Sequence, residues 1–303
     1  MLCRGQTTTA VTVFAPAKLN LFLKVLGKRD DGYHELETLM LSVGLYDTLV
    51  LVDDPQGELR LTCRDGGPAH RSSQRRELPR AGPDNLVLRA AELLKRATGS
   101  SRGAHIELVK RIPLASGLAG GSSDAAATLA GLDRLWNLKL TTPELARLAA
   151  QLGSDVPFFL SSTSAAICRG RGELVEPLPL AARFWFVIAR PQSGLSTADV
   201  YRQCRPSRID WAAWELAASL ARGQLQKAAG LFHNALQEPA ERMNADVTRL
   251  KTAFARQAFA GHMMSGSGTS YFGLCRSRRH AVTLGARLKA ARLGDVFVVS
   301  SRP

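Results

Sequence analysis

The chain of 303 residues carries 40 lysines and arginines against 26 aspartates and glutamates, and its formal net charge of +14 invites a nucleic-acid interpretation. With 45% apolar residues it can bury a substantial core, which excludes disorder as the main state and allows one large or two ordinary domains. No transmembrane helix is expected, because the longest apolar runs, such as residues 184–189, are far shorter than the roughly 20 residues of a membrane span.

The first half of the chain predicts both strands and helices. Its start is polar, and Pro16 and Lys18 interrupt the next apolar stretch, unlike a secretory signal, so we expect a cytoplasmic protein. Alternating apolar and polar side chains predict strands at residues 9–25, 37–43, 48–52, 59–63 and 105–109. Helices are predicted at residues 85–97 with Asp84 as N-cap, at 121–135, and at 143–152 with Thr142 as N-cap and Pro143 first.

The second half repeats this mixture. Strands are predicted at residues 165–168 and 184–189, and helices follow at residues 211–222 and 245–259. The end of the chain predicts strands at 262–265, 270–275 and 295–300 and a helix at 280–291. The pattern indicates an α+β protein with two domains, residues 1–164 and residues 165–303.

Part of the positive charge is concentrated in one irregular segment. Residues 60–82 hold six arginines and two acidic residues among glycines and prolines, which is typical of a loop or an insertion. An RNA-binding segment would interleave aromatic residues for stacking, and this one has none. We interpret it as a solvated basic loop, although a positive field around a cleft that binds polyphosphates fits equally well.

The cysteines are widely scattered, odd in number and without a CxxC pair: Cys3, Cys63, Cys168, Cys204 and Cys275. Neither a disulfide framework nor a cysteine zinc site is therefore expected. Ordinary reduced thiols are the interpretation that this spacing favours.

The most informative stretch is the glycine-rich segment of residues 113–124, which lies between a predicted strand and a predicted helix. Glycine lets the backbone approach a ligand closely, successive N–H groups can face one concavity, and the following helix start favours an anion. These features predict phosphate binding, and the alternative is a flexible surface loop capped by Ser122 or Ser123. Neither GxxxxGK[ST] nor GxGxxG is present, so a lysine from another segment must serve the site.

Two further segments can complete such a site. Lys18 and Asn20 are two residues apart and face the same way in a strand, while Leu19 and Leu21 face the core. Residues 264–270 form a second glycine-rich turn between two predicted strands, for which an ordinary hairpin is an equal alternative.

Asp155 follows a predicted helix, at a terminus where the helix dipole favours cations instead. A carboxylate there, beside Lys18, would stay ionised and could orient or deprotonate an attacking hydroxyl. The alternative is a turn residue that bonds its own backbone.

Residues 16–21, 28–35, 117–126 and 153–159, together with 169–173 and 264–270, carry a resemblance to the GHMP kinases. The resemblance covers nearly the whole chain and implies the two-domain GHMP kinase fold, with the active site in the cleft between the domains. The second and fourth segments indicate a member whose substrate is an alcohol bearing cytidine diphosphate. The main departure is the long arginine-rich stretch before residue 83.

The resemblance also implies roles for individual residues. Lys18 and Asp155 would prepare a substrate hydroxyl to attack the γ-phosphorus of ATP, with Mg²⁺ as the cofactor. The ATP site would comprise Asn85, Leu86 and Lys110 near the adenine, together with Pro113, Gly117, Leu118, Ala119, Gly120, Gly121, Ser122 and Ser123. Asn20 would contact the substrate, Tyr33 and Tyr201 would sandwich the cytosine, and His34 would bond its edge. The metal ligands stay open: Ser123 and Asp155 are candidates, and ATP phosphates and water are the alternative.

Two rival functions remain at this point. One is a GHMP kinase that acts on homoserine or mevalonate, against which residues 31–34 argue, because neither substrate has a base to stack. The other is a nucleic-acid-binding protein driven by its charge, which would bind with a steep salt dependence. We expect a small-molecule kinase, a monomer or a homodimer, with no nucleic-acid or membrane partner.

Overall fold

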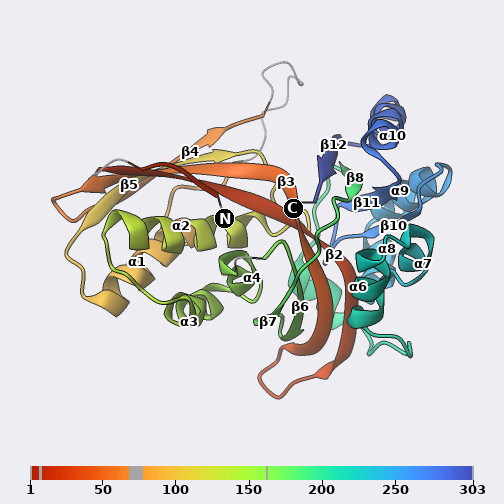
Figure 1. Cartoon of the computed structure of the whole chain (residues 1–303), viewed down its shortest axis with the longest axis horizontal. Coiled ribbons are helices and arrows are strands. Elements are labelled where there is room, and N and C mark those ends of the chain that lie inside the picture. The colour runs from red at the N-terminus through yellow and green to blue at the C-terminus, as the bar shows by residue number, and fades with distance from the viewer. Residues whose placement is uncertain (1, 7–8, 68–77, 162, 302–303) are drawn as a thin grey trace. The chain divides into compact units, whose positions relative to one another are not determined.

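The computed structural model describes residues 2–6, 9–67, 78–161 and 163–301 (Figure 1). The chain forms two compact units: unit 1 comprises Met1–Ala17, Leu45–Leu114 and Ala119–Ser162, and unit 2 comprises Lys18–Gly44, Ala115–Leu118 and Thr163–Pro303. Two long strands, β2 (Ala10–Lys28) and β3 (His34–Asp54), contribute residues to both units. The division at residue 164 stays a prediction.

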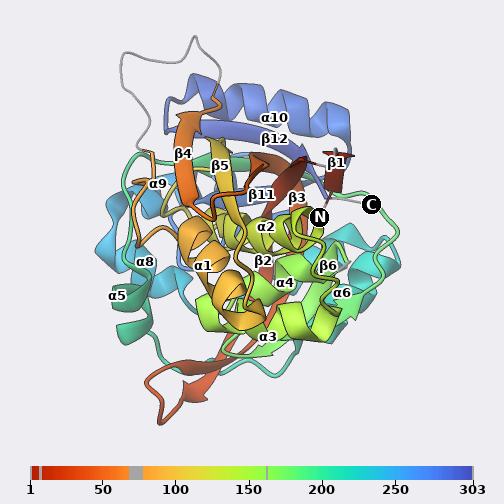
Figure 2. The same cartoon turned by 90° about the vertical axis from the view of Figure 1, so that its left-hand side faces the viewer.

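Among its described residues, unit 1 combines a β-sheet with four helices. Besides parts of β2 and β3, its strands are β1 (Leu2–Gln6), β4 (Leu59–Asp65) and β5 (Gly103–Lys110). β3 and β5 are antiparallel, with Thr48 opposite Val109, and β4 runs parallel to β5. The helices lie on one side of these strands (Figures 1 and 2): α1 (Leu86–Thr98), α2 (Gly120–Leu135), α3 (Thr142–Leu152) and α4 (Val156–Leu160).

Unit 2 contains the rest of the chain. A four-stranded antiparallel sheet has the order β10 (Gly261–Met264), β11 (Tyr271–Cys275), β8 (Trp185–Arg190) and β12 (Asp295–Ser300). β6 (Ala165–Gly170) pairs with β3 and β7 (Leu174–Leu178), and β9 (His233–Asn234) pairs with β2. The helices are α5 (Thr197–Arg202), α6 (Ala213–Ala221), α7 (Leu225–Gly230), α8 (Gln237–Met243), α9 (Ala245–Ala255) and α10 (Arg278–Ala290).

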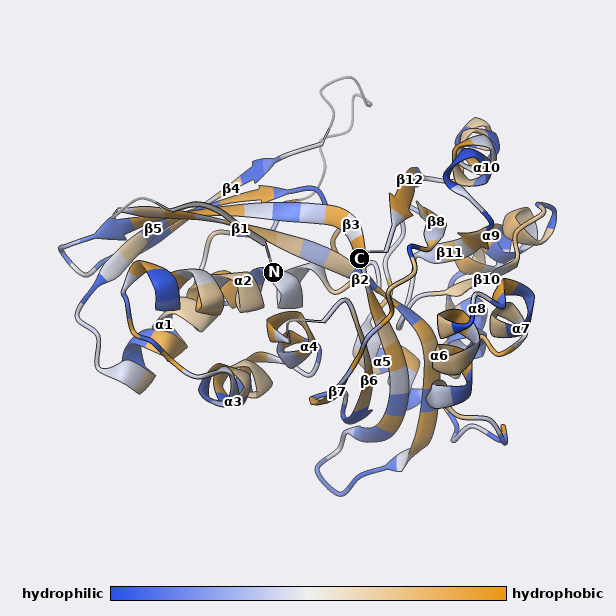
Figure 3. Cartoon of the chain, viewed as in Figure 1, coloured by the Kyte–Doolittle hydropathy of each residue, from blue (hydrophilic) through white to orange (hydrophobic). Residues whose placement is uncertain are grey.

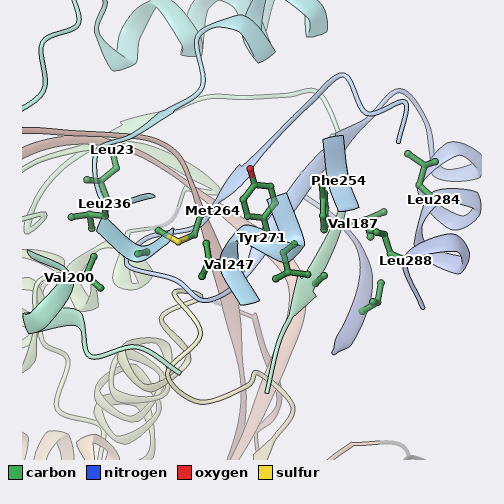
Figure 4. Packing of buried hydrophobic residues seen from close by; sticks show 14 of the residues in the cluster. Leu23, Val187, Val200, Leu236, Val247, Phe254, Met264, Tyr271, Leu284 and Leu288 are labelled. Carbon is green, nitrogen blue, oxygen red and sulfur yellow. The ribbon is translucent and has the colours of Figure 1, made fainter. Parts of the chain in front are cut away.

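The core of unit 2 is built from apolar residues spaced to face one another. Hydrophobic and hydrophilic residues alternate along α10 (Figure 3), and its buried positions include Ala281, Leu284 and Leu288. Figure 4 shows Phe254, Tyr271 and Met264 between Leu236 on one side and Leu284 on the other. Full burial of such side chains contributes about 1.5–3 kcal/mol each, and this packing supports β10 and β11, which flank the glycine-rich turn.

Most predicted elements are confirmed, with corrections at their ends. Residues 37–43 and 48–52 belong to one continuous strand, β3, and the predicted helix 245–259 already ends at Ala255. Asn85, and not Asp84, caps α1 by accepting a hydrogen bond from the N–H of Val87 at 3.0 Å. Thr141, and not Thr142, caps α3 and forms a capping box with Glu144. The short elements were not predicted from the sequence: β1, β7, β9, α4, α5, α7 and α8.

The basic segment begins in a strand, because β4 extends to Asp65, while residues 68–77 of the predicted loop lie outside the described residues. Cys63, Cys168, Cys204 and Cys275 are free cysteines. Within the part of the chain that the structure describes, we find no group of three or more His, Cys, Asp and Glu side chains arranged to hold a metal ion. Nor does any helix there have the length and apolar character needed to cross a membrane.

Candidate functional site

Lys18 and Asn20 form a buried polar pair on β2, in unit 2. Their exposed fractions are 4% and 1%, and the Nζ of Lys18 donates a hydrogen bond to the Oδ1 of Asn20. The Nδ2 of Asn20 donates to the Oγ1 of Thr38 at 2.8 Å, and that hydroxyl donates to the carbonyl of Phe22 at 2.6 Å. Because β2 and Thr38 of β3 hold the amide in place, the ammonium group has a defined position.

The glycine-rich turn 265–270 joins β10 to β11 and packs against this pair. The Oγ of Ser265 accepts from the backbone N–H of Asn20 at 3.2 Å and donates to the carbonyl of Gly117 at 3.1 Å. A Cβ atom at Gly266 would lie 3.3 Å from the Nζ of Lys18. The turn is a hairpin, as the alternative interpretation held, but it also contacts Lys18 and the glycine-rich segment at Gly117.

We use the name phosphate loop for residues 111–119, between β5 and α2. The backbone is left-handed at Ala115, Gly117 and Ala119, with φ of 47°, 75° and 55°. The N–H of Lys18 donates to the carbonyl of Leu118 at 3.1 Å. A Cβ at Gly117 would lie 2.1 Å from the carbonyl oxygen of Ser265, so only glycine fits there.

In unit 1, α2 begins at Gly120 without a side-chain cap, because its N-cap residue is Ala119. The N–H groups of the first helical turn have no partner inside a helix and carry the positive end of the helix dipole. The Oγ of Ser123 is buried and has no hydrogen-bond partner in the described structure. The helix start therefore offers both amide and hydroxyl groups suited to a phosphate or its metal ion.

Lys110 is bound to two carboxylates that no sequence pattern predicted. Its Nζ lies 2.5 Å from the Oδ2 of Asp47 and 2.8 Å from the Oδ2 of Asp124, and all three side chains are buried. Burial raises the pKa of Asp124 to about 8, with Asp47 acting in the same direction and Lys110 against it. The two carboxylates raise the pKa of Lys110 despite its burial, so the lysine stays charged.

We expect Asp124→Asn to flatten the dependence of stability on pH. Since the folded-state pKa of Asp124 exceeds its unfolded value, folding takes up a proton, and this stabilising contribution disappears as pH rises through about 8. The difference in free energy of unfolding between the parent protein and Asp124→Asn should thus favour the parent protein more at pH 5 than at pH 9. The change in this difference should be about 1 kcal/mol or more. Urea unfolding of both proteins measures this difference, and parallel pH profiles would contradict it.

Asn85 and Leu86, predicted near the adenine, lie at the start of α1. The Oδ1 of Asn85 caps the helix, and its Nδ2 donates to the carbonyl of Arg80 at 2.9 Å. A Cβ at Gly121 would lie 3.5 Å from the Cδ1 of Leu86, so the two helix starts are adjacent. The structure thus brings this predicted adenine position beside the predicted phosphate position within unit 1.

Asp155 is the N-cap residue of α4, which corrects the sequence-based argument about its helix. α3 ends at Leu152, and Pro157 at the second position of α4 helps to start a new short helix directly after Asp155. A helix start favours a carboxylate, so the position of Asp155 is electrostatically favourable and not unfavourable. Its side chain makes no capping hydrogen bond to α4.

The predicted base-binding residues lie in unit 2. The ring of His34 lies 5.2 Å from that of Tyr201, at an interplanar angle of 33°. Tyr33 is 51% exposed, and the Cζ of Arg171 lies 4.6 Å from its ring centroid. Burial, and secondarily the charge of Lys28, lowers the pKa of His34, so a neutral imidazole is favoured. It can then donate one hydrogen bond and accept another at the edge of a base.

Several residues that support these groups were not predicted from the sequence. Thr38, Asp47, Asp124, Arg171 and Asn234 have this role, and the Nδ2 of Asn234 donates to the carbonyls of Met264 and Gly266 at 2.9 and 2.8 Å. The only available signals were Asp124 inside the segment 117–126 and Arg171 inside 169–173.

Comparison with known protein families gives two matches. The chain matches the GHMP kinases N terminal domain over residues 85–163 and the GHMP kinases C terminal domain over residues 215–292. It is 40% identical over 263 residues to the 4-diphosphocytidyl-2-C-methyl-D-erythritol kinase of Alkaliphilus metalliredigens, covering 86% of each chain. It is 43% identical over 278 residues to the enzyme of the same name from Symbiobacterium thermophilum, covering 90% of this chain and 93% of the relative.

Solved structures agree with these relatives. A crystal structure of 4-(cytidine 5'-diphospho)-2C-methyl-D-erythritol kinase superposes with a TM-score of 0.78 at 35% identity, covering 96% of this chain and 99% of the other. Mevalonate kinase of L. major, in complex with R-mevalonate, superposes with a TM-score of 0.71 at 16% identity, covering 99% and 97% of the two chains. At that identity the second likeness shows the fold alone.

Proposed function

Since the chain belongs to the 4-diphosphocytidyl-2-C-methyl-D-erythritol kinases within the GHMP kinase family, we propose that it transfers the γ-phosphoryl group of ATP to the 2-hydroxyl of 4-diphosphocytidyl-2-C-methyl-D-erythritol. The products are the 2-phosphate and ADP, and the reaction belongs to non-mevalonate isoprenoid biosynthesis. The observation that carries the proposal is the identity of 40% or more with these enzymes over most of the chain.

Phosphoryl transfer depends chiefly on positioning and on neutralising charge. The carboxylate of Asp155 orients the acceptor hydroxyl and takes its proton, while the ammonium of Lys18 stabilises negative charge near the reacting oxygens. The N–H groups at the start of α2 bind the phosphates of ATP, with the left-handed phosphate loop leading into them. The anchoring of Lys18 by Asn20 supports its assignment, because a fixed charge needs no reorganisation during the reaction.

Mg²⁺ is part of the proposal, and the residues present fit it. The buried Oγ of Ser123, which has no partner among the described residues, is an oxygen ligand of the kind that magnesium accepts, and Asp155 offers a carboxylate. When bound, the ion neutralises charge on the ATP phosphates.

The cytidine part of the substrate is proposed to bind at Tyr33, His34 and Tyr201. Arg171 lies over one face of Tyr33, so a base would stack on the opposite face. A neutral His34 both donates and accepts hydrogen bonds, which suits the mixed edge of cytosine.

For Tyr33→Ala we expect KM for the cytidine substrate to rise about tenfold or more, because base stacking contributes about 1–3 kcal/mol. KM for ATP should change less than about twofold. Tyr33→Phe, which keeps the ring, is the matched control and should stay close to the parent protein. Steady-state kinetics with each substrate varied in turn make the comparison, and equal rises in both KM values would refute the stacking role.

An ADP-release assay tests the reaction itself. Purified protein with ATP and Mg²⁺ should form ADP when 4-diphosphocytidyl-2-C-methyl-D-erythritol is added. Homoserine and mevalonate, the substrates of the rival hypothesis, should produce no ADP above background. Absence of turnover with the cytidine substrate would overturn the proposal.

The positive charge of the chain also suits the proposed substrates. The net charge of +14 can speed the arrival of ATP and of a diphosphate-bearing alcohol, since a positive field attracts polyphosphates. A cytoplasmic location, a monomeric or homodimeric state and the lack of a nucleic-acid partner stay predictions. Nucleic-acid binding that persists at physiological salt would contradict the last of these.

A further inference from the structure

Two carboxylates and one ammonium group are buried together in unit 1, where β5 ends and α2 begins. Asp47 belongs to β3, Lys110 is the last residue of β5, and Asp124 lies in α2. The exposed fractions of the three side chains are 0%, 5% and 3%. We call these residues the Lys110 cluster.

The Lys110 cluster ties together both ends of the phosphate loop. The Oδ1 of Asp47 accepts from the backbone N–H groups of Arg111 and Ile112, the latter at 2.9 Å, and so fixes the first loop residues. On the other side, Asp124 binds the same ammonium group through its Oδ2. A Cβ at Gly120 would lie 3.1 Å from the Nζ of Lys110, so the first residue of α2 packs directly on the lysine.

We propose that Asp124 and Asp47, acting through Lys110, are positioning residues that hold the start of α2 and its phosphate-binding amides in place for ATP. This inference rests on the proposed ATP site. The ammonium group uses two of its three donors on the carboxylates, so Lys110 acts mainly by joining Asp47, which holds the backbone of residues 111 and 112, to Asp124 of α2. A displacement of about 1 Å in such a positioning group is enough to lower catalysis by as much as 10²-fold.

Three strands of unit 1 contribute the groups around the Asp124 carboxyl group. The Oδ1 of Asp124 is buried and has no hydrogen-bond partner in the described structure. The groups that face Asp124 are Lys110 from β5, Asp47 from β3 and the thiol of Cys63 from β4. The carboxyl group of Asp124 thus links the N-terminal part of α2 to Lys110 of β5 and, through it, to Asp47 of β3.

The test compares Asp124→Ala with Asp53→Ala. Asp53 of β3 forms an ion pair at 2.7 Å with Arg102, the residue just before β5, at the opposite end of that strand from Lys110. We expect Asp124→Ala to weaken ATP binding, measured by calorimetry with Mg²⁺ and without the second substrate, by about tenfold. Hydrogen exchange of the amides at residues 117–123 should become faster. Asp53→Ala should change neither quantity, although its stability falls.

Asp124→Asn keeps an oxygen that accepts from Lys110 and should restore ATP binding to within about threefold of the parent protein. Should Asp124→Ala fail to fold, Asp124→Ser carries the same expected loss. The inference would be overturned if the ATP dissociation constant of Asp124→Ala stayed within about twofold of the parent value, or if Asp53→Ala lost as much ATP affinity as Asp124→Ala. Binding of cytidine diphosphate to the same proteins serves as the internal reference. A parent protein that binds ATP but does not turn over the cytidine substrate would overturn the proposed function and leave this inference intact.

Discussion

Asp155→Asn is expected to lower kcat by about 10²–10⁴-fold. The KM values for ATP and for the cytidine substrate should change by less than about threefold. Asparagine preserves the shape and one oxygen of the side chain, but it cannot accept the proton of the attacking hydroxyl. The loss should therefore appear in the chemical step and not in ground-state binding. Steady-state and single-turnover kinetics with ATP, Mg²⁺ and the cytidine substrate measure it.

A control must separate this loss from the effect of removing a carboxylate at a helix start. Asp246 lies in the first turn of α9 and accepts a hydrogen bond from the Oγ of Ser193 at 2.7 Å. Asp155→Asn and Asp246→Asn should both lower the free energy of unfolding by about 0.3–1 kcal/mol, but only the first should lower kcat. If Asp155→Asn turned over at the parent rate, the role of Asp155 as base would have to be abandoned.

We expect Gly117→Ala to lower both stability and turnover. The new Cβ would lie 2.1 Å from the carbonyl oxygen of Ser265, a backbone atom that cannot move aside by rotating a side chain. The turn 265–270 would have to shift, and with it the hydrogen bond from the N–H of Asn20 to Ser265. The expected cost is about 2–4 kcal/mol in the free energy of unfolding, measured by urea denaturation, and about 10²-fold in kcat.

Gly99→Ala is the matched control, because it imposes the same backbone strain without the steric clash. Gly99 has φ of 68°, against 75° for Gly117, and no atom lies within 4 Å of its added Cβ. Gly99→Ala should lower the free energy of unfolding by only about 1–2 kcal/mol and leave kcat unchanged. Equal losses in both variants would mean that strain alone, and not the contact with Ser265, accounts for the requirement for glycine.

Local patterns predicted most of the fold, because periodicity and capping are local properties. The cap errors have a simple cause: Asp84 and Asn85 are adjacent and both suit an N-cap, as do Thr141 and Thr142, so only the backbone geometry decides between them. α4 was missed because five residues are too few to show a helical period. Because α4 was not predicted, Asp155 was assigned to the end of the preceding helix, where a carboxylate is electrostatically unfavourable.

The candidate site was predicted through its resemblance to a family, and its supporting contacts were not. Lys18, Asn20 and Gly117 were identified from short segments of the sequence. The partners of Lys110 could not be, since Asp47 lies 63 residues earlier and only the register of β3 with β5 brings it near. Arg171 over Tyr33 is likewise a product of two hairpins folding together.

The continuity of β2 and β3 has a consequence for dividing this protein into fragments. Residues 18–44 complete unit 2 by pairing with β6 and β9, although they lie near the start of the chain. A fragment of residues 1–164 would contain β2 and β3 without β6 and β9. A fragment of residues 165–303 would contain β6 and β9 without β2 and β3. Separate expression should thus give poorly soluble pieces, while co-expression of the two pieces should restore a soluble complex through strand pairing. The hairpin of β2 and β3 therefore contributes to both units. Sites for splitting or fusing the chain are better chosen in exposed loops than at its middle.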